Sequence, residues 1–148
     1  MNVFIFSFNF NPVSVKAADQ KIAQLNSELS TQKIIQKHCD SYQLCRKVIE
    51  DCKSAKDPKA YHTKHQAEYH LHDSLKKELQ NLGVTKIPSS DKIKKRIENL
   101  ESEQTASVRE KQGLQEKQKL LNTIQQNFNV LLDAPEMQPP LSEKENTL

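Results

Sequence analysis

The chain has 148 residues, of which 22 are Lys or Arg and 19 are Asp or Glu, so its formal net charge is +3 with neutral histidines. Apolar residues make up 35% and aromatic residues only 5%, which argues against a thick globular core of Phe, Trp, Ile and Val. The two glycines argue against an all-β fold with tight turns and against glycine-rich loops that hold phosphate groups. The composition predicts an elongated all-α protein of one domain at most, and nothing in it indicates an enzyme.

Residues 1–15 differ from the rest of the chain, and we expect an irregular or non-native segment there. Phenylalanines at positions 4, 6, 8 and 10 alternate with other residues, a period of two that is typical of a strand. A signal peptide is the alternative, because small residues follow at positions 15 and 17, but no Lys or Arg precedes the apolar run. The segment is too short to span a bilayer as a helix. We therefore expect a cytoplasmic protein without a membrane span, with secretion through a weak N-terminal signal as the alternative.

The placement of the prolines predicts three helices. Proline breaks a helix interior because it lacks the N–H group and clashes with the preceding turn. The six prolines leave three long uninterrupted stretches, and we expect helices over about 16–54, 58–82 and 90–132. Together they make one helical module over residues 16–132, an elongated coiled-coil-like hairpin or bundle. The acidic, proline-containing tail 133–148 is expected to be disordered.

In the first predicted helix the apolar positions change register near residues 32–35. Three apolar-stripe residues precede the shift and six follow it: Ile22, Leu25 and Leu29, then Ile35, His38, Tyr42, Cys45, Ile49 and Cys52. At about 1.5 Å per residue the helix is roughly 55 Å long, which is longer than any core this chain can build. Part of it is therefore expected to form a coiled-coil arm.

The second predicted helix has local signals at both ends. Asp57 is a candidate cap for the exposed N–H groups, and Pro58 follows at a position where its missing N–H has no cost. Gly83 is expected to end the helix in a left-handed conformation. A linker then runs to Pro88, because the residue before a proline disfavours the helical conformation.

The third predicted helix carries an apolar seam whose spacing alternates between four and three, as in a coiled-coil heptad. Six apolar positions define this association seam: Ile93, Ile97, Leu100, Leu114, Leu121 and Phe128. The middle of the seam is polar, with Gln104, Ser107 and Lys111. We expect this middle either to be weakly packed or to meet polar partners.

No arrangement of side chains indicates a catalytic centre, a cofactor or a small-molecule substrate. His65, Glu68 and His72 share one helix face, but the two histidines are two turns apart, roughly 10 Å, which is beyond the reach of one metal ion. We therefore expect no metal site. His70 and His72 match a nuclease His-x-His motif that works on a strand, whereas on a helix residues two apart point in nearly opposite directions. The cysteines have no Cys-x-x-Cys spacing, and we expect reduced thiols packed as small hydrophobic residues at Cys39, Cys45 and Cys52.

Basic residues cluster at the start of the third predicted helix, at Lys92, Lys94, Lys95 and Arg96. One interpretation is a contact with DNA phosphates, from which Lys and Arg release counterions. The other is a solvated charged face, which acidic residues further along the same helix balance. The sequence pI of about 8.7 is lower than the value that indicates nucleic-acid binding by itself, so we favour the second interpretation.

Residues 61–88 resemble the C-terminal helical region of relaxases, the mobilisation nucleases of conjugative and mobilisable elements in Gram-positive bacteria. With the helices on either side, the resemblance covers about residues 16–132. In that family a Tyr begins a helix with a His-x-x-Glu-x-x-x-His pattern, and a Gly-Val-x-Lys-x-Pro linker leads into a long helix. The matching positions here are Tyr61, His65, Glu68, Leu71, His72, Leu75, Gly83, Val84, Lys86 and Pro88. The N-terminal domain of the family, which nicks DNA with a tyrosine and a histidine-bound metal, has no match in this chain.

The resemblance implies a non-catalytic helical interaction module that mediates protein association during conjugative DNA mobilisation. Its implied partner is a second copy of the chain or another helical protein of a mobilisation complex. The residues of the family motif then have a structural role: Tyr61, His65, Glu68, His72, Gly83 and Pro88. The alternative is a DNA-binding accessory protein that uses the basic start of the third helix on phosphates. We expect no enzymatic activity.

Overall fold

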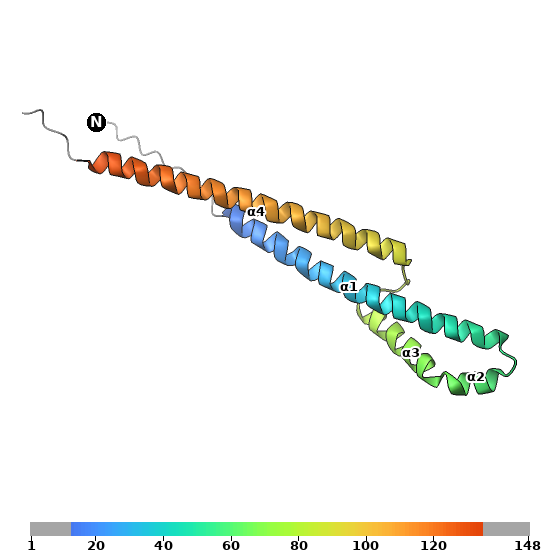
Figure 1. The fold of residues 1–148 in the computed structure, drawn as a ribbon. Coiled ribbons are helices and arrows are strands. Elements are labelled where there is room, and N and C mark those ends of the chain that lie inside the picture. Colours follow the sequence, from blue (N-terminus) through green and yellow to red (C-terminus); the bar gives the residue numbers. More distant parts are fainter. Residues whose placement is uncertain (1–12, 135–148) are drawn as a thin grey trace, which may run out of the picture.

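The computed structural model describes residues 13–134, and all their regular secondary structure is helical. The described residues form four helices, arranged as in Figure 1: α1 (Val13–Ser54), α2 (Pro58–Lys64), α3 (Gln66–Asn81) and α4 (Ser90–Asp133). The prediction of an all-α fold is confirmed. None of the described helices combines the length and the hydropathy that a membrane span requires.

Two of the predicted helices have nearly the expected ends. Helix α1 begins at Val13, three residues before the expected start, and ends at Ser54 as expected; α4 ends at Asp133, one residue later than expected. The predictions for residues 1–12 and 135–148 lie outside the described residues. The finer prediction of a coiled-coil hairpin stays a prediction.

The prediction of one helix over 58–82 is wrong, because the chain leaves the helical path at His65, where φ is −109° and ψ is 25°. The N–H of His65 is shared between the carbonyls of Tyr61 and His62, at 3.0 and 3.2 Å, as is common at helix ends. No Gly or Pro causes this break. It lets two short helices, α2 and α3, each pack against the same straight helix α1.

The local signals at the ends of this region act as the sequence predicts. Asp57 Oδ1 accepts hydrogen bonds from the N–H groups of Lys59 and Ala60, both at 3.1 Å, and Pro58 is the first residue of α2. After α3, Gly83 has a φ of +80°, which a residue with a Cβ atom rarely adopts. The N–H of Val84 then donates to the carbonyl of Leu79 at 2.9 Å, which satisfies an end carbonyl of the helix.

Helix α1 is central and packs against each of the other helices. After Ser54 the chain turns back, and α2 and α3 lie along the second half of α1 (Figure 1). Helix α4 lies along the first half of α1 and runs in the opposite direction. Four polar contacts join the two helices in this register: Asp19 with Lys111, Asn26 with Gln104, Glu28 with Arg96, and Lys33 with Glu101.

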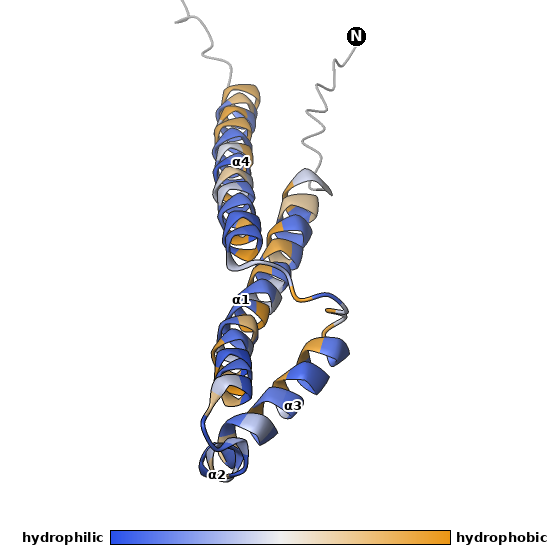
Figure 2. Ribbon diagram, turned by 90° about the vertical axis from the view of Figure 1, so that its right-hand side faces the viewer, coloured by the Kyte–Doolittle hydropathy of each residue, from blue (hydrophilic) through white to orange (hydrophobic). Residues whose placement is uncertain are grey.

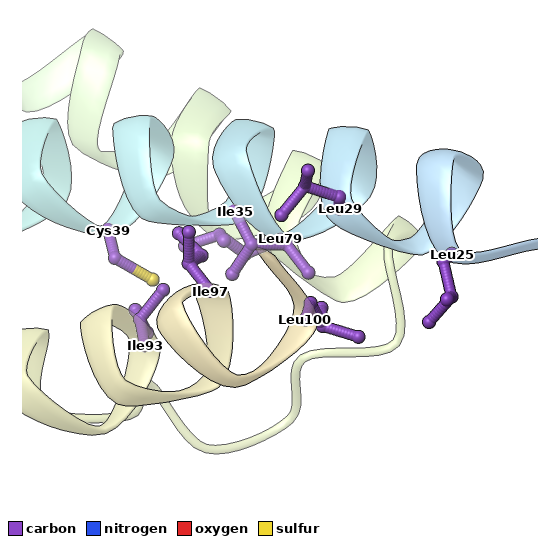
Figure 3. Packing of buried hydrophobic residues seen from close by; sticks show 8 residues of the cluster. All are labelled: Leu25, Leu29, Ile35, Cys39, Leu79, Ile93, Ile97 and Leu100. Carbon is purple, nitrogen blue, oxygen red and sulfur yellow. The ribbon is translucent and has the colours of Figure 1, made fainter. Parts of the chain in front are cut away.

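The hydrophobic core lies where α1, α3 and α4 overlap near the middle of α1 (Figure 3). Its buried members come from all three helices: Leu25, Leu29, Ile35 and Cys39 from α1, Leu79 from α3, and Ile93, Ile97 and Leu100 from α4. Val84 and Ile87 of the linker and Tyr42 pack against this cluster. Leu79 and Leu100 are the most deeply covered large side chains, each only 1% exposed.

The polar middle of the α4 seam meets polar partners on α1, which is one of the two expected outcomes. Gln104 donates a side-chain hydrogen bond to Asn26, and the Lys111 ammonium lies 2.5 Å from the Asp19 carboxylate. Between these contacts Ser107 is 2% exposed, and its hydroxyl oxygen has no hydrogen-bond partner among the described residues. The centre of the α1–α4 contact is therefore held by polar pairs at its edge, with one unsatisfied hydroxyl inside.

Candidate functional site

Helix α4 extends past the beginning of α1. Asp19 faces Lys111 across the antiparallel pair, so Val13, six residues earlier on α1, lies at the level of Lys117, six residues later on α4. Residues 118–133 of α4 therefore have no described segment of α1 beside them, as Figure 1 shows. We refer to residues 118–133 as the α4 extension. At about 1.5 Å per residue it is roughly 24 Å long.

The α4 extension is apolar on one side and exposed. Leu121 is half-buried, whereas five other large apolar side chains on that side are between 44% and 74% exposed: Leu120, Ile124, Phe128, Leu131 and Leu132. Figure 2 shows hydrophobic residues recurring along this end of α4. Charged residues are few here, since Lys119 and Asp133 are the only ones in the segment. An exposed apolar stripe of this kind is typical of an interaction surface.

The predicted association seam divides into three parts. Ile93, Ile97 and Leu100 are buried within the chain by α1 and α3. Leu114 and Leu121 are half-buried, and Phe128 is 48% exposed. Only the last part of the seam is therefore available for contact with another molecule.

The histidine-rich motif residues make contacts within the chain. His65 Nδ1 donates to Glu68 Oε1 at 3.1 Å, and its ring packs on Tyr61 with a centroid separation of 4.3 Å. His72 stacks on Tyr42 of α1 with a centroid separation of 4.5 Å. Of the other two motif residues, Gly83 ends α3, and Pro88 is half-buried in the linker. These contacts join α2 and α3 to each other and to α1.

Three ionisable side chains of α2 and α3 have shifted pKa values with clear causes. A hydrogen bond with the Cys52 side chain, with partial burial, raises the pKa of Tyr69 to about 12. The hydrogen bond from His65 lowers the pKa of Glu68. Burial also raises the pKa of Tyr61, so both tyrosines of α2 and α3 keep their protons more firmly than free tyrosine.

The cysteines are packing residues in the described structure. Cys39 and Cys45 are buried and Cys52 is half-buried, all as free thiols, and burial raises the pKa of both Cys39 and Cys45. No group of three His, Cys, Asp or Glu side chains within residues 13–134 is placed to hold a metal ion. His65 and His72 instead bind separate partners, Glu68 and Asp73.

The basic cluster lies in the first two turns of α4. Lys92, Lys94 and Lys95 are exposed, and none of them forms an ion pair with another residue of the described part of the chain. Arg96 pairs with Glu28 on α1 and is therefore engaged in the fold. Three of the four basic residues thus face solvent.

Sequence reasoning missed three residues of the exposed stripe, Leu120, Ile124 and Leu131. Leu120 directly precedes the seam residue Leu121, and Ile124 and Leu131 follow Leu121 and Phe128 by three residues each, so these side chains widen the apolar face beyond a single heptad line. Cys39 was also missed as a contact with α4, although it follows Ile35 by one helical turn. In both cases, an apolar residue close to a predicted apolar position was the feature of the sequence that could have identified the missed residue.

No family model matches the chain, and no curated protein or solved structure matches it either.

Proposed function

We propose that this chain is a non-catalytic helical module that associates with protein partners through the α4 extension. The observation that supports this most is the exposed apolar stripe on a helix end that runs past its partner helix. Contact between such a stripe and water is unfavourable, so the free energy falls when another apolar surface covers the stripe. The core is compact where three helices overlap, so the exposed stripe is not needed to hold the fold together.

We propose no catalytic role for Tyr61 or Tyr69. A tyrosine that attacks a DNA phosphate must lose its proton, and a raised pKa opposes that loss. Tyr61 and Tyr69 both have raised pKa values. We expect no nicking of single-stranded origin-like DNA with a divalent metal ion present. A covalent adduct of DNA with either tyrosine would contradict this part of the proposal.

The setting we propose is the assembly of proteins during DNA mobilisation. Its support is the resemblance of residues 61–88 to the C-terminal region of relaxases. A structural role for the motif is further supported by the stacking of His72 on Tyr42 of α1 and by the hydrogen bond of His65 with Glu68 where α2 meets α3.

Site-specific photo-crosslinking tests whether the α4 extension binds a protein. A photoreactive phenylalanine analogue replaces Ile124 in one variant and Leu44 of α1 in the control; both positions are exposed apolar sites, Leu44 at 70%. In cells that produce the chain, we expect a protein adduct from position 124 and none of comparable yield from position 44. Equal yields at the two positions would contradict association through the extension.

Three exposed lysines support a second candidate function, phosphate contact on DNA. Replacing Lys92, Lys94 and Lys95 by Gln should weaken duplex binding and flatten its salt dependence. The matched control replaces three exposed lysines elsewhere, Lys47, Lys53 and Lys56, and removes the same charge. If the unmodified chain binds no DNA at low salt, or both triple variants lose binding equally, this candidate fails.

A further inference from the structure

We propose that the α4 extension pairs with the α4 extension of a second copy of this chain, antiparallel, about a two-fold axis at the level of Gln126. This inference rests on the proposed association through the extension and names its partner. It is carried by the order of the apolar residues along the extension and by their exposure.

The apolar residues are placed symmetrically about Gln126. Leu120 lies six residues before it and Leu132 six after; Leu121 lies five before it and Leu131 five after. Ile124 and Phe128 lie two residues to either side. In an antiparallel pair centred on Gln126, each residue stands at the level of the partner's residue at the same distance on the other side. Every apolar side chain of the stripe therefore meets an apolar side chain of the second copy.

These six residues also share one face of the helix. At about 100° per residue they fall within an arc of roughly 120°, centred on the side opposite Gln126. Lys119 and Asp133 lie on the far side and stay in water when the faces meet. Val130 lies outside the arc, although it is 70% exposed. A self-complementary face of this kind gives a closed two-fold interface.

The charges on the preceding part of α4 favour the antiparallel orientation. On the same face, before the extension, lie the exposed residues Glu103, Glu110 and Lys117. In a parallel pair, each of these charged residues would lie beside the same residue of the second copy. Two like charges that lie side by side repel each other. The antiparallel pair separates the two bodies and brings only the extensions together.

The area available is sufficient for a modest dimer. With roughly 100 Å² of apolar surface per side chain, six side chains from each copy bury on the order of 1,200 Å² in total, the lower end of stable interfaces. We therefore expect an equilibrium between monomer and dimer that depends on protein concentration.

Sedimentation equilibrium of the full chain over a wide concentration range tests the pairing. The mass should rise from the monomer value of 17.0 kDa to twice that value. Ile124→Asp should raise the dissociation constant at least tenfold. In the dimer Ile124 of each copy meets Phe128 of the other, so the substitution removes two apolar contacts. Val130→Asp is the matched control, with the same added charge at an exposed site outside the arc, and it should leave the constant unchanged. Circular dichroism checks that both variants remain helical.

A mixing experiment tests the orientation. Ile124→Lys and Phe128→Glu should each dissociate alone, but an equimolar mixture should recover dimers. Only the antiparallel pair sets the new Lys beside the new Glu, because position 124 faces position 128 there. In a parallel pair each charge faces an unchanged apolar residue, so recovery fails.

The outcomes separate this inference from the proposed function. A chain that stays at 17.0 kDa at all concentrations, or no recovery on mixing, overturns the pairing. If position 124 still crosslinks to a different protein in that case, the proposed function stands. A monomeric chain without a position-124 adduct overturns both.

Discussion

The carboxylate of Asp19 on α1 lies 2.5 Å from the ammonium of Lys111 on α4, and this ion pair is the one nearest the start of α1 among the described residues. Both side chains are partly exposed, so the pair contributes little to stability, about 0–1 kcal/mol. Its importance is positional. It gives the register in which α4 runs past Val13, and this register leaves the apolar end of α4 without α1 beside it.

The core where three helices overlap should depend strongly on Leu79. We expect Leu79→Ala to lower the free energy of unfolding by about 2–5 kcal/mol, because the cavity opens between α1, α3 and α4. Leu44→Ala, at a 70% exposed site on α1, is the control and should change it by less than about 0.5 kcal/mol. Urea denaturation followed by circular dichroism measures both. A loss below about 1 kcal/mol for Leu79→Ala would contradict the described core.

Ser107 offers the opposite prediction, a gain in stability. Its buried hydroxyl has no partner among the described residues, so removing it by Ser107→Ala removes a desolvation cost of about 1 kcal/mol or more. Alanine also has a higher helix propensity than serine. Ser102→Ala, at an exposed site of α4, is the control that measures this contribution alone. We expect the melting temperature to rise more for Ser107→Ala than for Ser102→Ala. An equal or smaller rise would show that the hydroxyl is satisfied in solution.

Stability at acid pH should depend on Glu68. The hydrogen bond from His65 lowers the pKa of Glu68 below its ordinary value of 4.5. The folded state therefore binds the proton less readily than the unfolded state, so this stabilisation is complete above about pH 4.5 and is lost as pH falls through the lower folded pKa. Glu68→Gln should lower the melting temperature at pH 6, and the difference from the unmodified chain should shrink below pH 4. Glu110→Gln, at an exposed site, is the control and should show no such convergence.

Stability at alkaline pH should depend on Tyr69. Its pKa is raised to about 12, so between its ordinary value of 10 and that value the unfolded state loses the proton first, and stability falls as pH rises. In an absorbance titration of the three tyrosines, one phenol should titrate near pH 12 and disappear in Tyr69→Phe. Cys52→Ser should retain part of the shift, and Cys52→Ala should lower the pKa of Tyr69, because the thiol is the leading cause of the shift. A late-titrating phenol that persists in Tyr69→Phe would contradict the assignment.

The candidate site was predictable in part. The heptad spacing identified Leu121 and Phe128 as members of an apolar face, because that spacing is a property of one helix alone. It could not separate the buried Ile93 and Leu100 from the exposed Phe128, since all occupy equivalent positions on α4. Exposure depends on where the partner helix begins, and that is set by the offset between α1 and α4.

The sequence by itself determined the helical class of the protein and most helix ends, because those signals act over a few residues: the cap at Asp57, the left-handed Gly83 and the prolines that interrupt helices. The break at His65 was decided only by the tertiary structure, since no local breaker stands there and α2 and α3 each pack against a straight α1. The register of α4 on α1 was decided in the same way. Each depends on contacts between residues far apart in the chain, which the periodicity of a single helix does not encode.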